Sequence, residues 1–165
     1  MRKMTQSELK SNILHNPNPI FDEEIEFSEF IELLAIRNKK IEFNKKTVFS
    51  YGAIFQGVDL TFYGAVFHES LEIENVSKIQ FVNCSLNNIK VSDCQNLFLS
   101  FKDCEINSIY FERTSHSEDL IFENTIINEF KSLESDFSRL QFTSDVKNKK
   151  IGKLVISGKT INILE

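Results

Sequence analysis

The sequence is poor in several things: it has no tryptophan, two prolines, five glycines and three cysteines in 165 residues. No apolar run approaches the ~20 residues that a membrane-spanning helix needs. The first eight residues lack the apolar centre of a signal peptide. An odd number of cysteines also argues against a secreted framework of disulfides. We therefore expect a cytoplasmic protein whose thiols are reduced.

Short chemical motifs are also missing. The chain has no glycine-rich phosphate loop, no Cys-x-x-Cys pair and no His-Glu-x-x-His zinc motif. Its three histidines, His15, His68 and His116, are isolated in sequence and form no recognisable triad or ligand spacing. We therefore expect no enzymatic activity, no cofactor and no metal.

The chain contains sixteen phenylalanines. It also contains a repeat with a period of five between residues 79 and 114. Neither a helix, with 3.6 residues per turn, nor a strand, with a repeat of two, produces this period. It predicts a solenoid made of short straight segments and corners. Two columns of mostly apolar or small residues recur in step. The first contains Ile79, Cys84, Ile89, Cys94, Leu99, Cys104, Ile109 and Thr114, and the second contains Phe81, Leu86, Val91, Asn96, Phe101, Ile106, Phe111 and His116.

Several five-residue blocks support a family resemblance. Ala53-Ile-Phe-Gln-Gly, Val58-Asp-Leu-Thr-Phe, Ala65-Val-Phe-His-Glu, Cys84-Ser-Leu-Asn-Asn and Cys104-Glu-Ile-Asn-Ser each place a small residue two positions before Leu, Ile or Phe. This pattern, over roughly residues 53–130, resembles the pentapeptide-repeat family. The resemblance implies a right-handed quadrilateral β-helix with four five-residue faces per coil.

Residues twenty apart should then stack in an all-β solenoid of about five coils. The three cysteines should point inward as small buried thiols, because ten residues make half a coil and leave Cys94 opposite the other two. Asp103 and Glu123 should be neighbouring carboxylates on an outer face. The predicted stacks are Phe81, Phe101 and Ile121; Leu86, Ile106 and Ile126; Val91 and Phe111; Cys84 and Cys104; and Ile89 and Ile109.

A lone coil cannot cover its own apolar cross-section, so we expect caps at both ends. Residues 1–40 should form an N-terminal helical cap, with a weak helix around residues 9–14 and a clearer one over residues 22–37. The second carries six carboxylates between positions 22 and 32 and could instead be an acidic docking helix. Residues 41–146 should form the β-helix, opened by a strand at 41–43. Residues 147–165 should form a C-terminal cap of two short strands around Ser157 and Gly158.

The charge distribution indicates the kind of partner. The chain carries a net charge of −5, but residues 53–146 hold fifteen acidic and six basic residues. Such a surface suits a basic protein better than nucleic acid or a membrane. We expect a monomer or weak dimer that docks on a basic partner, such as an immunity or antitoxin protein neutralising a toxin, often a nuclease. The candidate contact residues are Asp93, Asp103, Glu105, Glu112, His116, Glu118, Asp119 and Glu123, three of which lie in a polar run, 114–119, that interrupts the repeat.

Two other functions remain open at this point. Some pentapeptide-repeat proteins imitate duplex DNA and bind type II topoisomerases, and an acidic rod suits that role. The five-residue unit is irregular here, however, and the C-terminal tail is basic, with five lysines after residue 146. The other possibility is a purely structural module that assembles end to end.

Overall fold

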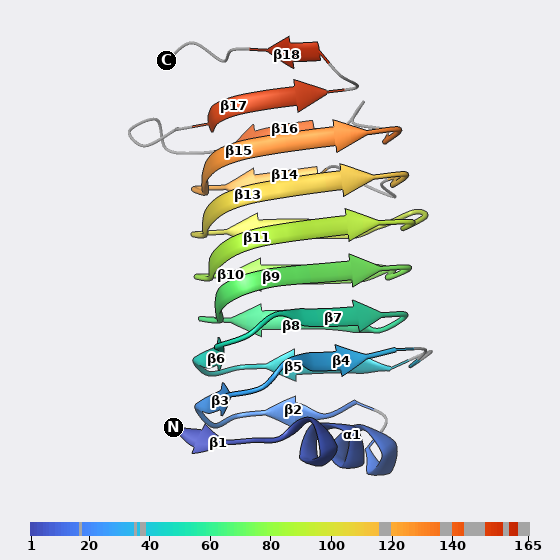
Figure 1. Cartoon of the computed structure of the whole chain (residues 1–165), viewed down its shortest axis with the longest axis vertical. Helices are drawn as coiled ribbons and strands as arrows, with labels where there is room; N and C mark the ends of the chain where they lie inside the picture. Colours follow the sequence, from blue (N-terminus) through green and yellow to red (C-terminus); the bar gives the residue numbers. More distant parts are fainter. Residues whose placement is uncertain are drawn as a thin grey trace.

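The chain winds as a parallel β-solenoid of about six turns with one short helix at its N-terminal end (Figure 1). The computed structural model describes residues 1–16, 18–34, 36, 39–115, 120–135, 140–143, 151–156 and 159–161. The front strands run from left to right and the back strands from right to left as the chain climbs, so the coil is right-handed. The predicted fold class is confirmed, with about six turns where about five were expected.

Two sheets form the walls of the solenoid, and every strand pair is parallel except β17 with β18. Most turns contribute one short strand to the back sheet and one longer strand to the front sheet. The back sheet contains β2 (Ile20–Phe21), β5 (Lys40–Phe43), β8 (Asp59–Tyr63), β10 (Lys78–Val82), β12 (Phe98–Lys102), β14 (Leu120–Glu123) and β16 (Leu140–Thr143). The front sheet contains β1 (Arg2–Lys3), β3 (Ile25–Phe27), β4 (Ile31–Leu33), β6 (Thr47–Phe49), β7 (Ala53–Gln56), β9 (Val66–Glu74), β11 (Ser85–Ser92), β13 (Glu105–Glu112), β15 (Ile126–Leu133), β17 (Ile151–Ile156) and β18 (Lys159–Ile161).

The N-terminal end of the core is covered by α1 (Gln6–His15), as the sequence predicts. Thr5 caps the helix: its hydroxyl accepts a hydrogen bond from the Glu8 N–H, and the Glu8 carboxylate accepts one from the Thr5 N–H. Leu9 and Ile13 are buried on one side of the helix. At the other end, β17 and β18 confirm the predicted pair of short strands.

The predicted helix over residues 22–37 is wrong, because this segment forms β3 and β4. Ile25 and Phe27 point inward and flank Glu26, and Ile31 and Leu33 do the same around Glu32. Each short strand has parallel partners, β1 and β6 for β3 and β7 for β4. Pairing with neighbouring coils therefore outweighs the helical spacing in this segment, and strands of both sheets precede residue 41.

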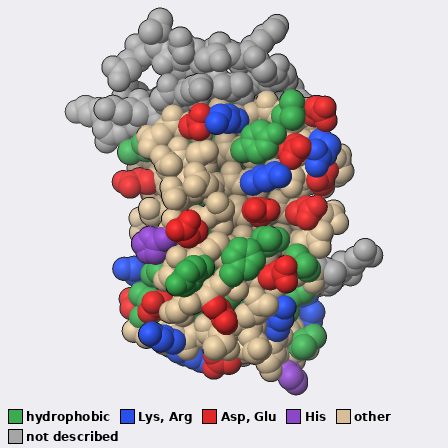
Figure 2. Space-filling model, in the orientation of Figure 1, with side chains coloured by type: hydrophobic (Ala, Val, Ile, Leu, Met, Phe, Trp, Pro, Cys, Tyr) green, Lys and Arg blue, Asp and Glu red, His purple; other side chains and the backbone are tan. Residues whose placement is uncertain are grey.

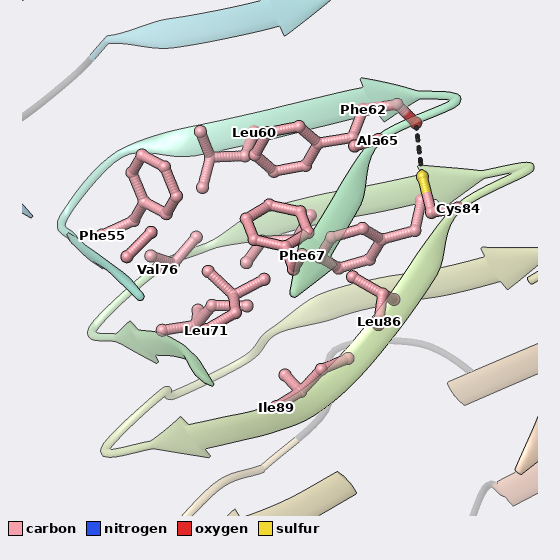
Figure 3. Close-up of a cluster of buried hydrophobic side chains, with 14 of the residues drawn as sticks. Phe55, Leu60, Phe62, Ala65, Phe67, Leu71, Val76, Cys84, Leu86 and Ile89 are labelled. Carbon is pink, nitrogen blue, oxygen red and sulfur yellow. Dashed lines mark hydrogen bonds between the residues drawn. The ribbon is translucent and has the colours of Figure 1, made fainter. Parts of the chain in front are cut away.

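Stacked phenylalanine rings fill much of the interior. Neighbouring rings in the back column lie 5.0–5.4 Å apart, and those in the front column 4.3–4.9 Å apart. Rings of the two columns meet edge to face, as Phe62 and Phe67 do with their planes at 87°. Figure 3 shows this part of the core, where Leu71 and Leu86 also point inward. The back column is Phe21, Phe43, Phe62, Phe81, Phe101 and Phe122, and the front column is Phe27, Phe49 and Phe67, continued by Leu86, Ile106 and Ile127.

The twenty-residue register holds in the middle of the chain and then slips by one. Phe81 pairs with Phe101, and Val91 pairs with Phe111, as predicted. In the next turn Phe122 follows Phe101, whereas Ile121 pairs with Ser100. Likewise Leu86 pairs with Ile106, Ile106 with Ile127, and Ile126 with Glu105. Ile89 pairs with Ile109 as expected.

Ile121 and Ile126 therefore do not continue the columns, contrary to the prediction. The hydroxyl of Ser115 still donates to the side chain of Gln95, twenty residues earlier, whereas residues 121–123 follow the longer spacing of twenty-one. The spacing consequently increases by one residue between Ser115 and Ile121. That interval contains residues 116–119 of the polar run, which are outside the described part of the chain.

The corners between strands use the left-handed backbone region, with φ between 46° and 73°. Asparagine and aspartate, which tolerate this conformation better than other non-glycine residues, hold most of these positions. At seven corners of the two ladders, all except the last of each, the N–H donates to a carbonyl of the next coil, for example Asn83 to Lys102 at 2.8 Å. One ladder is Gly64, Asn83, Asp103 and Asn124, and the other is Gly57, Asn75, Asp93, Arg113 and Glu134.

Candidate interaction surface

The structure separates the predicted contact residues into two groups. Asp93 follows β11 and Glu112 ends β13, so both lie at the corner that closes the front sheet. Asp103, Glu105 and Glu123 lie where the back strands end and the front strands begin. His116, Glu118 and Asp119 lie outside the described residues. The five described residues therefore do not form one contact surface.

The first group is neutralised by neighbouring cations. The guanidinium of Arg113 donates to both carboxylate oxygens of Asp93, at 2.7 and 2.8 Å, and to Glu112. Lys90 lies 3.3 Å from the other oxygen of Glu112. The hydrogen bonds from Arg113 lower the pKa of Asp93 and of Glu112. Both carboxylates are thus ionised and largely compensated, which leaves little charge for a partner.

The second group also differs from its prediction. Asp103 and Glu123 are not stacked carboxylates, because the coil between them has one extra residue. Asp103 instead accepts a hydrogen bond from the Asn124 amide at 2.6 Å. Glu123 lies beside Lys102, with its carboxylate 2.8 Å from the ammonium group, and this contact raises the pKa of Lys102. Glu105 is exposed and pairs along the backbone with Ser85 and Ile126.

Negative charge is concentrated on one side of the solenoid. We define the front face as the outward side chains of β4, of β7 and of the segments of β9, β11, β13 and β15 that begin at Glu69, Asn88, Ser108 and Glu129, with the corner residue after each strand. Up to residue 135 it carries eight carboxylates and three cations, whereas the back strands from β5 to β14, with their corner residues, carry four carboxylates and three cations. The front-face carboxylates are Glu32, Glu69, Glu72, Glu74, Asp93, Glu112, Glu129 and Glu134, and the cations are Lys90, Arg113 and Lys131. On the back side the cations are Lys40, Lys78 and Lys102, and the carboxylates are Glu42, Asp59, Asp103 and Glu123.

Five front-face carboxylates have no ion pair with a cation among the described residues, and four of them lie on β4 and β9, on either side of β7; the fifth is Glu134, after β15. Figure 2 shows this side of the molecule. Backbone pairing places Glu32, Ile54 and Glu72 on three successive strands of one outer column. The carboxylates of Glu32, Glu69 and Glu72 have no hydrogen-bond or ion-pair partner among the described residues. Glu74 accepts a hydrogen bond from the Gln56 amide at 3.0 Å.

This surface was not predicted from the sequence, because a helix was expected over residues 22–37. The available signal was the alternation of apolar and acidic residues around Glu26 and Glu32, which is typical of half-buried strands. With that segment placed as strands, Glu32 of β4 joins the carboxylates of β9 on one surface. The charge of the repeat region was predicted correctly, but its position along the solenoid was not.

The three cysteines have a structural role. Cys84, Cys94 and Cys104 are buried and unbridged, as predicted. Each thiol donates to the carbonyl two residues earlier, and burial raises the pKa of Cys94 to about 11. Such a thiol is a poor nucleophile at neutral pH. Within the described residues, no group of three or more His, Cys, Asp or Glu side chains could hold a metal ion.

A shallow groove of about 530 Å³ runs across β9, β11, β13 and β15, beside the front face. One wall is a ladder of amides in which Asn107 donates to Asn87 at 3.2 Å and Asn128 donates to Asn107 at 3.3 Å. Asn87 in turn donates to the carbonyl of His68. These amides bond mainly to one another, so the ladder is explained by the stacking of coils.

The described part of the chain contains no helix long and apolar enough to cross a membrane. Comparisons with family profiles, with curated proteins and with solved structures give no match. The description of the fold and of the front face therefore rests only on the sequence and structure of this chain.

Proposed function

We propose that this protein is a non-catalytic binding scaffold that docks its front face on a basic surface of another protein. Its most specific form is an immunity or antitoxin protein that covers the cationic working surface of a toxin such as a nuclease. The observation that supports this is the excess of carboxylates on the front face, several of them without a cation among the described residues. We also propose that the chain is a member of the pentapeptide-repeat family.

Two physical arguments favour a rigid acidic scaffold for such a role. Charge of one sign on one side raises the rate of encounter with an oppositely charged partner and disfavours partners of like charge. A surface carried on stacked, hydrogen-bonded coils also loses little conformational entropy on binding, which leaves more of the contact energy for affinity. We propose the cytoplasm as the place of action, because unpaired buried thiols suit a reducing compartment.

The test is affinity capture from the source cell with two variants of equal charge. The front variant is Glu32→Gln, Glu72→Gln and Glu74→Gln. The control is Glu42→Gln, Glu105→Gln and Glu123→Gln, which removes the same charge elsewhere. We expect the wild type and the control to retain a basic protein that the front variant releases. Binding should also weaken as ionic strength rises from about 0.05 M to about 0.5 M. Equal retention by all three proteins, or binding insensitive to salt, would contradict the proposal.

The identity of the captured protein also separates the alternatives. A type II topoisomerase whose supercoiling activity falls when the protein is added would support DNA mimicry instead. A captured nuclease or other toxin whose activity is blocked supports the immunity role. Self-association into long polymers during size-exclusion chromatography would point to an assembly module.

A further inference from the structure

Exposed apolar side chains interrupt the carboxylates on the lower half of the front face. Phe30 is 49% exposed, Leu34 45% and Tyr51 56%. Figure 2 shows hydrophobic side chains gathered on this part of the face, with acidic side chains around them. We call this the front patch, and it consists of Phe30, Glu32, Leu34, Tyr51, Ile54 and Glu72.

The backbone register fixes the layout of the front patch. Phe30, Glu32 and Leu34 alternate outward along β4 and its two flanking positions, because Ile31 and Leu33 point into the core. Neighbouring strands of a sheet lie ~4.8 Å apart. Glu32 and Glu72 therefore stand about two strand spacings apart, with Ile54 between them.

Phe30 is held in place by a glycine. A Cβ atom added to Gly52 would lie 2.9 Å from Cε2 of Phe30 and 3.1 Å from the carbonyl oxygen of Ser70. The ring thus rests against backbone that carries no side chain, while about half of its surface stays open to solvent. A fixed, half-open aromatic ring loses little entropy when another molecule covers it, which is a property of residues at the centre of binding sites.

We propose that the front patch binds an arginine-bearing segment of a basic protein. The arginine stem covers Ile54, its guanidinium lies between Glu32 and Glu72, and an apolar residue of the same segment packs against Phe30 and Tyr51. This inference rests on the proposed function and adds the chemistry of the contact. The unpaired carboxylates favour a cationic partner, and the apolar side chains beside them favour one that also brings apolar surface.

Arginine fits this surface better than lysine or a metal ion. Its planar guanidinium donates two parallel hydrogen bonds to a carboxylate and also packs on aromatic rings. Lysine offers a compact, strongly hydrated charge that does neither as well. A divalent cation needs several oxygen ligands around one point, whereas here the carboxylates of Glu32 and Glu72 are separated by an isoleucine.

The probe is a pair of short blocked peptides with the sequences Arg-Val-Arg-Leu-Arg and Lys-Val-Lys-Leu-Lys, titrated into the ¹⁵N-labelled protein. We expect the arginine peptide to shift amide resonances of β4, β7 and β9 and to bind several-fold more tightly than the lysine peptide. Phe30→Ala should weaken its binding about tenfold. Leu133→Ala removes another exposed apolar side chain of the same face and should leave binding unchanged.

Equal affinity for the two peptides, or equal effects of the two substitutions, would overturn the inference. Phe30→Ala could weaken binding by disturbing the fold. The double variant Glu32→Gln with Glu72→Gln tests the same patch without changing Phe30, and it should also weaken binding of the arginine peptide. If partner capture depends on the front-face carboxylates but the peptide shifts lie elsewhere, this inference fails while the proposed function stands. If the arginine peptide binds the front patch but capture ignores the carboxylates, the proposed function fails instead.

Discussion

Ser132 is a polar residue in an apolar position. Its backbone pairs with Phe111 in the adjacent strand, where a large side chain points into the core. Ser132 is 3% exposed, and its hydroxyl has no hydrogen-bond partner among the described residues. The next residue, Leu133, is 43% exposed, so a serine is buried beside a partly exposed leucine. A buried hydroxyl that lacks a partner retains the cost of leaving water.

Ser132→Ala should therefore stabilise the protein, by about 1 kcal/mol, because it removes the hydroxyl without adding volume. Midpoints of urea unfolding for the two proteins measure the difference. Ser108→Ala is the matched control, since Ser108 lies on the outer side of β13 and its change should be near zero. A Ser132→Ala protein that is less stable than the wild type would show that the hydroxyl contributes a favourable contact.

Single residues also show which sequence inferences succeed. The burial of Cys84, Cys94 and Cys104 was predicted from their places in the period of five, which the structure fills with inward-pointing side chains at these three positions. Asn96 lies in the second column of the same period but is exposed. The Asp103–Glu123 pair was wrong because it depended on the length of one coil. That length changed across the polar run, where no apolar residue marks the register.

At the level of the strand and its corners, the chain replaces glycine with asparagine and aspartate. Asn83 lies at φ 55° and donates its N–H to the carbonyl of Lys102. Other non-glycine residues adopt this conformation at a cost of about 1–2 kcal/mol. A sequence with five glycines can thus still turn two corners in nearly every coil, which its composition alone would not suggest.

Asn83→Ala should destabilise the protein by about 1 kcal/mol, whereas Asn83→Gly should be nearly neutral. Chemical unfolding of the two variants and the wild type provides the measurement. Asn88→Ala, on the exposed part of β11, controls for the loss of an asparagine side chain and should change little. Equal stability of the alanine and glycine variants at position 83 would mean that the corner is not strained.

The elements that the sequence predicts well are those with many consecutive repeats. Between β10 and β13 the columns recur several times, so the period specifies both the strand positions and their register. Residues 25–33 contain only two short apolar pairs, and these also fit a helix. Whether the segment forms a helix or strands depends on the strands that pair with it, and its own sequence does not identify these partners.

At the scale of the whole molecule, a stack of coils is only as stable as its covered ends. Each coil contacts mainly its neighbours, so the apolar cross-section of the first coil must be closed by something other than a coil. Leu9 and Ile13 of α1 are buried there. The helix is thus part of the core and completes it at the N-terminal end.

Leu9→Ala should cost about 2–5 kcal/mol, and its effect should be local. Native-state hydrogen exchange should show faster exchange in β2, β3 and β5 while β10 to β13 keep their protection. Leu14→Ala, at a position that is 79% exposed, should change neither. A uniform loss of protection along the solenoid would instead indicate that all coils unfold together.

The uneven charge of the two sides gives the molecule an electric dipole across its width. The back sheet contributes little to it among the described residues, and the front face supplies the negative pole. In the field of a cationic body, such a molecule experiences a torque while the two surfaces are still separated by about a Debye length of ~8 Å. The molecule therefore turns its negative side toward the cationic body before contact, so the side that carries Phe30 makes the first contact.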